Sequence, residues 1–394
     1  MGRLKLQDEL TKGNISTIQS SDQHPSYANG LPDSNIVAWR PPSSWEIHLS
    51  NEHVLEKQHA SVPALDGIAV AHNSLLEMTR FQRFIRRMES AGPRVILDRL
   101  KEEWHDAVDD EANEELLLEK QLWVLTAFQL QNLGTLKTTP KPQCNTGKIL
   151  ELSGNLGELC SLLPPRVWLI PTLAEVFQLS AMHSRHKVHY VTTEPKRPMP
   201  LPGNVSYHTV PQPGFVSYPW PNSHFSHIRA STLPSLVPSS ELPGLLRECC
   251  RLLAPGGLLE IRIMDAAPVR KTAGPKMRAW IEDRLSLNLE RHFRCTKPCL
   301  LLPAWVADAG FELPAQVGDM RVMRLPCAFD DRSANVDVEL KALVGRALWK
   351  DIWGSFVDED PEEAAWWWED EDLMQECLER QTVFECGAIY AYKK

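Results

Sequence analysis

From Lys148 to the C-terminus, short apolar segments that suit β-strands alternate with segments of helical periodicity, and this alternation constrains the fold more than any other feature. Strands that are separated by helices join through right-handed crossovers into a parallel sheet. A final segment at 383–392 alternates Phe384, Cys386, Ala388 and Tyr390, which suits an antiparallel strand inserted near the sheet edge. We therefore predict an α/β fold with helices on both faces. The parallel strands are predicted at 148–152, 187–193, 204–210, 225–230 and 257–264.

The chain before Lys148 divides into three parts by composition. Residues 1–62 are polar and rich in turn-forming residues, which predicts a mostly disordered arm. Residues 63–134 carry apolar residues at spacings of three, four and seven, which is typical of helices. Residues 135–147 have the composition of a linker. The predicted organisation is thus an arm, a helical extension, a linker and one domain over 148–394.

Charge and cysteine usage exclude several classes of protein. Lys and Arg number 42 against 51 Asp and Glu, and the net charge of −9 argues against nucleic acid as a partner. No stretch of 18 apolar residues predicts a membrane span, and the N-terminus lacks the apolar core of a signal peptide. Nine cysteines without a CxxC pair indicate buried thiols in a reducing compartment. We expect a cytoplasmic protein, with the nucleus as the alternative location.

The first predicted strand leads into a turn of small residues. Glu151 lies near the end of this strand, and Ser153, Gly154, Asn155 and Gly157 follow it. Small residues at such a turn let the backbone approach a nucleotide at the carboxyl ends of the strands. A plain strand-to-helix turn explains the same pattern about equally well.

An acid follows the second predicted strand. Glu194 occupies the position where folds of this kind bind the hydroxyl groups of a ribose. The competing interpretation is a surface glutamate before Pro195.

Two further segments carry a specific resemblance. The sequence PWPNSHFSHI (219–228) is followed by a predicted helix. After this helix comes the segment LAPGGLLEIRIMD (253–265), which contains the predicted strand 257–264. Together they resemble the region from the third to the fifth strand of class I S-adenosylmethionine-dependent methyltransferases. The chain is similar to a divergent branch of methyltransferase-like proteins from filamentous fungi. The resemblance extends over 145–394 and implies a Rossmann-like sheet with S-adenosylmethionine as the cofactor.

The resemblance also assigns roles to individual residues. It places Glu194 on the ribose, while Arg229 and Ala230 line the methionine end of the cofactor. Asp265 ends the fifth strand on the substrate side and is a weak candidate for a catalytic group; His224 and His227 have no better claim. The remaining residues assigned to the cofactor are Glu151, Ser153, Gly154, Asn155 and Gly157.

The sequence departs from the family pattern at the first crossover. Ser153 and Asn155 stand where the family has glycines. Gly157 and Glu194 are 37 residues apart, whereas one crossover helix needs roughly 20. The excess falls on the proline-containing segment 158–173, which we interpret as an atypical insertion.

These features favour an enzyme that transfers a methyl group to a small molecule. A non-catalytic, methyltransferase-like interaction protein is the alternative, because the first turn has lost glycines. A nicotinamide dehydrogenase shares the turn and the ribose acid, but it does not explain LAPGGLLEIRIMD.

Two conspicuous clusters have less specific interpretations. Trp366, Trp367 and Trp368 lie among acidic residues; we interpret them as an amphipathic helix packed on the sheet, with a docking patch for a protein partner as the alternative. His183, His186 and His189 straddle a predicted helix-to-strand boundary, so they would not share a face, and we expect no metal site.

Overall fold

The computed structural model describes residues 83–102, 110–133, 140–152, 173–192, 201–210, 217–231, 233–313, 322–330, 335–358 and 365–394. The predictions for the arm 1–62, the turn residues Ser153–Gly157, the insertion 158–172 and Glu194 lie outside these residues. The described residues all belong to one compact unit, Ala38–Lys394.

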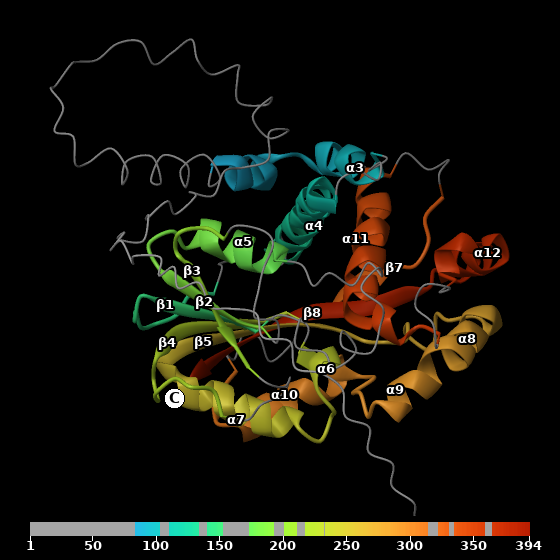
Figure 1. The fold of residues 1–394 in the computed structure, drawn as a ribbon. Helices are drawn as coiled ribbons and strands as arrows, with labels where there is room; N and C mark the ends of the chain where they lie inside the picture. Colours follow the sequence, from blue (N-terminus) through green and yellow to red (C-terminus); the bar gives the residue numbers. More distant parts are fainter. Residues whose placement is uncertain are drawn as a thin grey trace, which may run out of the picture. The chain divides into compact units, whose positions relative to one another are not determined.

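Eight strands form one mixed sheet with the order β3-β2-β1-β4-β5-β8-β6, and β7 also pairs with β8 (Figure 1). The first five strands are parallel, and β8 runs antiparallel to β5, β6 and β7. This confirms the predicted α/β fold with the final strand inserted near the edge. The strands are β1 (Lys148–Leu152), β2 (Lys187–Thr192), β3 (Val205–Thr209), β4 (Phe225–Ala230), β5 (Leu253–Met264), β6 (Phe311–Glu312), β7 (Met323–Pro326) and β8 (Val383–Lys393).

Helices cover both faces of the sheet. In Figure 1, α3, α4, α5 and α11 lie above the sheet, and α6, α7 and α10 lie below it. The helices are α3 (Pro93–Lys101), α4 (Asp110–Leu133), α5 (Ala174–Met182), α6 (Leu233–Leu236), α7 (Leu242–Leu252), α8 (Pro275–Ile281), α9 (Leu287–Arg291), α10 (Pro298–Asp308), α11 (Val336–Trp353) and α12 (Glu371–Arg380). A π-helical turn (Glu282–Ser286) joins α8 to α9, and 3₁₀ turns occur at Gly354–Phe356 and Trp367–Glu369.

The lower face of the central strands is mainly apolar. Leu150 and Leu152 of β1, Ile228 of β4 and Ile261 of β5 belong to one buried cluster with α7 and α10. Alternation along a strand sends these residues to one face, as the period of two requires. Helix α7 presents an apolar stripe to this cluster that includes Leu245, Leu246, Cys249 and Leu252.

Strand β5 begins four residues earlier than predicted. The sequence pattern placed its start at Gly257, but Leu253 already pairs with Phe225 of β4. The register shifts between Phe225 and His227, and Gly256 has a positive φ of 71°. Glycine adopts this left-handed conformation at little cost, so strand pairing continues through a segment that reads locally as a turn.

The helix predicted over the tryptophan cluster is also shorter than expected. Within the described residues, Trp367–Glu369 forms a 3₁₀ turn, and α12 begins only at Glu371. The Asp370 side chain accepts a hydrogen bond from the Leu373 backbone N–H and caps α12. An aspartate that caps the start of a helix separates the two helical segments, which a pattern based on apolar spacing does not show.

Trp367 is a core residue. Its side chain is fully buried, and its ring packs edge-on to Trp349 and Trp280 and obliquely against Phe384 of β8. Trp366 and Trp368 are half-buried and stack on each other. The central tryptophan therefore packs on the sheet, as the simpler interpretation expected.

Trp367→Ala should lower the free energy of unfolding by about 3–5 kcal/mol, because it leaves a cavity among aromatic rings. Trp366→Ala, at the half-buried neighbour, is the control and should cost clearly less. Urea denaturation of both variants measures the difference. Equal losses would show that Trp367 is not part of the core.

Three histidines lie close together where β2, β3 and the residue before β4 meet. His189 Nδ1 is 3.2 Å from His208 Nε2 and 3.0 Å from Ser206 Oγ, and its ring centroid is 6.3 Å from that of His224. Burial lowers the pKa of His189 to about 4, with a smaller contribution from nearby histidine and lysine side chains. His189 is therefore neutral in the folded protein at neutral pH.

Unfolding should become easier between pH 6.5 and pH 4 because of His189. The unfolded chain binds this proton below about pH 6.5, whereas the folded protein binds it only near pH 4. Stability is lost as the pH falls through this window, by on the order of 2–3 kcal/mol. His189→Gln should flatten the pH dependence of urea unfolding, and the exposed His292→Gln should not. An unchanged slope in His189→Gln would contradict the assignment.

Candidate functional site

Five ionisable side chains lie on the upper face of the central strands. Glu151 of β1 pairs in register with Arg229 of β4, and Arg229 pairs with Glu260 of β5. Because neighbours in register share a face, these three form a row across the sheet. His227 and Arg262 lie two residues away on the same strands and therefore on the same face.

Helix α5 closes over this row. Glu175 of α5 forms ion pairs with both Arg229 and Arg262, the latter at 2.7 Å. Arg229 also donates to Gln178 Oε1 at 3.0 Å. The guanidinium of Arg262 lies over the ring of Phe128 from α4, 4.9 Å from its centroid. We call Glu151, Glu175, Arg229, Glu260 and Arg262 the charged layer.

Glu151 differs from the other acids of the charged layer. It is fully buried, and within the described residues neither of its carboxylate oxygens has a hydrogen-bond partner. Its nearest opposite charge is Arg229 Nε, 3.7 Å from Glu151 Oε2. A buried carboxylate without hydrogen bonds is costly, so such a group indicates a place where a ligand or a further chain segment completes the site.

Burial and neighbouring charges act differently on these acids. Burial raises the pKa of Glu151 well above its usual range, and the charge of Arg229 opposes this rise. Burial also opposes ionisation of Glu175, but Arg262 and Arg229 outweigh it and lower the pKa. Burial opposes ionisation of Glu260 as well, but the His227 hydrogen bond and the arginine charges outweigh it and lower the pKa to about 2. Of these three acids, Glu151 is therefore the one whose pKa is raised.

The structure describes three of the eight residues assigned to the cofactor. Glu151, Arg229 and Ala230 lie side by side near the carboxyl ends of β1 and β4. The Arg229 guanidinium is held by the charged layer, and the Ala230 side chain is buried in the apolar lower face. The other five are Ser153, Gly154, Asn155, Gly157 and Glu194, which lie outside the described residues.

Asp265 has a clear structural role. Its Oδ1 accepts a hydrogen bond from the Cys299 backbone N–H at 2.9 Å, in the first turn of α10. An acid at this place satisfies a backbone donor and complements the helix dipole. Burial raises the pKa of Asp265, with the Cys299 hydrogen bond opposing. It thus links the end of β5 to α10, and its catalytic role stays a prediction.

The two histidine candidates lie away from the carboxyl edge. His224 precedes β4, and its Nε2 is 3.3 Å from Lys148 Nζ at the start of β1. His227 Nε2 is 3.1 Å from Glu260 Oε2 in the middle of the sheet. Ligands of open α/β sheets bind beyond the carboxyl ends of the strands. Neither position therefore favours a role as the catalytic base.

Metal ligation finds no support in the described part of the chain. The rings of His183 and His186 are 5.6 Å apart, and His183 is 5.8 Å from His227. No group of three or more His, Cys, Asp or Glu residues there has the geometry of a metal site.

None of the described helices combines the length and apolar character that crossing a bilayer requires.

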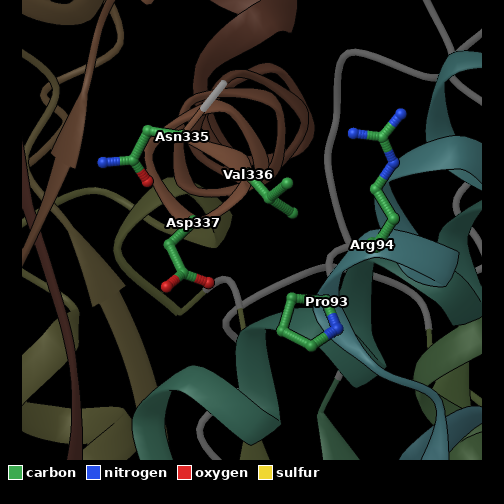
Figure 2. Close-up of a pocket in the computed structure, with 5 residues that line it drawn as sticks. All are labelled: Pro93, Arg94, Asn335, Val336 and Asp337. Atoms are coloured by element: carbon green, nitrogen blue, oxygen red, sulfur yellow. The ribbon is translucent and has the colours of Figure 1, made fainter. Parts of the chain in front are cut away.

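A cleft of about 570 Å³ lies between the N-terminal ends of α3 and α11 (Figure 2). Arg94 forms an ion pair with Asp98, and Asn335 caps α11. The other end of α11 carries Trp353, whose Nε1 donates to the Met264 carbonyl at the end of β5. An 18-residue helix extends roughly 27 Å, so this cleft is remote from the carboxyl edge. The remaining lining residues are Pro93, Val336 and Asp337.

Sequence reasoning missed Glu175, Glu260 and Arg262. A signal was present, because central parallel strands are usually apolar on both faces, whereas GLLEIRIM and FSHIRA carry charges at alternate positions. This spacing indicates a polar layer under a helix. It does not show that Glu175 of α5 joins the two arginines.

Comparison with known proteins gives structural similarity only. No family model matches the chain, and no curated protein matches it by sequence. Among solved structures, geranyl diphosphate methyltransferase in complex with SAM has a TM-score of 0.37 and 15% identity, over 75% of this chain and 94% of that one. Geranyl diphosphate C-methyltransferase from Streptomyces coelicolor has a TM-score of 0.35 and 13% identity, over 80% of this chain and 98% of that one.

Phosphoethanolamine N-methyltransferase 2 from Haemonchus contortus, in complex with S-adenosyl-L-methionine, has a TM-score of 0.36 and 10% identity. The alignment covers 77% of this chain and 60% of that one, so the chain spans less than two thirds of its length. These similarities are too weak to assign a function to any residue of the charged layer.

The charged layer should contribute strongly to stability. Arg262→Leu leaves Glu175 buried with one arginine, and it should lower the free energy of unfolding by about 3–5 kcal/mol. Arg94→Leu removes an exposed pair with Asp98 and should cost about 1 kcal/mol or less. Guanidinium denaturation of both variants tests this. Similar small losses would mean that the layer is hydrated and weak.

Proposed function

We propose that the protein is an S-adenosylmethionine-dependent methyltransferase that acts on a small-molecule acceptor. The observation that carries the proposal is the position of Glu151: a buried acid without hydrogen-bond partners in the described part of the chain, one residue before the carboxyl end of β1. It lies two residues before Ser153, where the turn that the sequence assigns to the cofactor begins. The strand order, with antiparallel β8 between β5 and β6, agrees with the sheet that the sequence resemblance implies.

The residues present suit this cofactor. S-adenosylmethionine carries an ammonium group and a sulfonium, and an ionised Glu151 complements a cation. The turn Ser153, Gly154, Asn155 and Gly157 would approach the cofactor through its backbone, together with the backbone of Ala230. Glu194 would accept hydrogen bonds from the ribose hydroxyls.

When bound, the cofactor supplies a methyl group on a sulfonium that already activates it. The protein's task is then to bind the cofactor and hold the acceptor in line with the methyl group, and orientation alone provides a large rate enhancement. This chemistry needs no nucleophile from the protein. It agrees with the structural roles of Asp265 and the two histidines, which leave the catalytic base unassigned.

Calorimetric titration with S-adenosylmethionine, S-adenosylhomocysteine and NAD tests the proposal. Binding of the first two ligands, without binding of NAD, supports a methyltransferase. Binding of NAD alone would instead identify a dehydrogenase. If none binds at millimolar concentration, the alternative of a non-catalytic interaction protein replaces the proposal, with the half-buried Trp366 and Trp368 as the first candidates for a docking surface.

Glu194→Gln should weaken cofactor binding roughly tenfold or more. The amide keeps the shape of the side chain but loses a charge-assisted hydrogen bond worth about 1.5–3 kcal/mol. Glu241→Gln, at an exposed position before α7, is the matched control and should bind as the wild type does. Unchanged affinity in a folded Glu194→Gln variant would place Glu194 on the surface instead.

A further inference from the structure

Arg229 lies beside the predicted cofactor site, but its donors are used within the protein. The residue is 6% exposed. Its guanidinium contacts Glu175, donates to Gln178 Oε1 at 3.0 Å, and reaches Glu151 at 3.7 Å. All of these partners belong to α5 and β1 and lie on the upper face of the sheet. A guanidinium held in this way has little freedom to bind the carboxylate of a ligand at the edge.

The acids around Arg229 do not depend on it equally. Glu175 has a second arginine, Arg262, at 2.7 Å. Glu260 has His227 at 3.1 Å. Glu151 has no such second partner in the described part of the chain, because Arg229 is its one ion-pair partner there. Loss of Arg229 would therefore affect Glu151 most.

The charges that face Glu151 can be named element by element. Strand β4 contributes Arg229, α5 contributes Glu175, and β5 contributes Glu260 and Arg262. On the other side of β1, the phenol-bearing Tyr190 of β2 is in register with Glu151. From α11, Asp351 interacts with Arg262. Two acids and two arginines thus surround Glu151, and Arg229 is the strongest influence that favours its ionised form.

We propose that Arg229 is a positioning residue that favours the ionised form of Glu151, so that Glu151 can bind a cationic group of S-adenosylmethionine, and that Arg229 does not contact the cofactor. This inference rests on the proposed function. A neutral carboxyl group would bind an ammonium or sulfonium less strongly than a carboxylate does, because charge-assisted hydrogen bonds are roughly twice as strong as neutral ones. Arg229 would therefore set the pH above which the cofactor binds.

The test is the pH dependence of S-adenosylmethionine binding, measured by calorimetry between pH 5.5 and pH 9. In Arg229→Met, the midpoint of the binding profile should move to higher pH. At a fixed pH below both midpoints, binding should weaken roughly tenfold for each pH unit that the midpoint moves. Glu175→Gln removes a negative charge near Glu151 while keeping an acceptor for Arg229. Its midpoint should move to lower pH.

Two further variants separate this role from a purely structural one. Arg229→Lys keeps the charge and should keep the wild-type midpoint. In Glu151→Gln the dependence on Arg229 should disappear, so the double variant Glu151→Gln/Arg229→Met should bind as Glu151→Gln does. The cofactor's own amine titrates in part of this range, but equally for every variant, so differences between variants report on the protein.

The outcomes are distinguishable. If the wild type binds no S-adenosylmethionine at any pH, the proposed function fails and the inference with it. If the wild type binds but Arg229→Met and Glu175→Gln keep its midpoint, or shift it in the same direction, the role of Arg229 is overturned and the function stands. If Arg229→Met does not fold, two variants still test the role of Arg229. The midpoint of Glu175→Gln should move to lower pH, and Glu151→Gln should lose the pH dependence that Glu151 causes.

Discussion

The bridge that Glu175 makes between Arg229 and Arg262 is the interaction on which the upper half of the domain depends. It fixes α5 against β4 and β5, and α5 is the helix that leads from β1 to β2. Two arginines and a glutamate buried together have lost hydration, and only well-placed mutual contacts offset that loss. The two ion pairs of Glu175 therefore determine where α5 lies on the sheet. The position of α5 in turn determines how Glu151 is buried.

The two faces of the sheet are stabilised by different kinds of interaction. The lower face is an apolar interface with α7 and α10, where burial of Leu and Ile side chains drives packing. The upper face carries the charged layer in its centre, flanked by an aromatic core around Trp349 and Trp367. Trp349 and Trp353 also donate to the carbonyls of Ala266 and Met264, which anchors α11 at the end of β5. The charged side chains of β1, β4 and β5 that form the charged layer thus lie on the face of the sheet that α5 covers.

Sequence patterns predicted the elements well where local signals agree. The limits of β4 were predicted to the residue, because a short run of strand-forming residues lies there between two segments of turn-forming residues. The start of β5 was wrong because Gly256 reads as a turn, although pairing with β4 continues through it. The helix over the tryptophans was wrong because Asp370 caps α12 and interrupts it. In both cases the conformation or hydrogen bond of a single residue sets the boundary of the element, and the spacing of apolar residues over a longer segment does not show it.

The sequence by itself determined the class of fold, the antiparallel insertion of the last strand and the position of an acid at the end of β1, because these follow from periodicity along the chain. Only the tertiary structure decided what surrounds that acid. Glu175 is 24 residues from Glu151 in the sequence, Arg229 is 78 and Arg262 is 111, and no local pattern relates them. These side chains come into contact because of the strand order and the position of α5 on the sheet, and both are set only when the sheet assembles. The charge state of Glu151 depends on burial and on these distant charges, so it exists as a property only once the chain has folded.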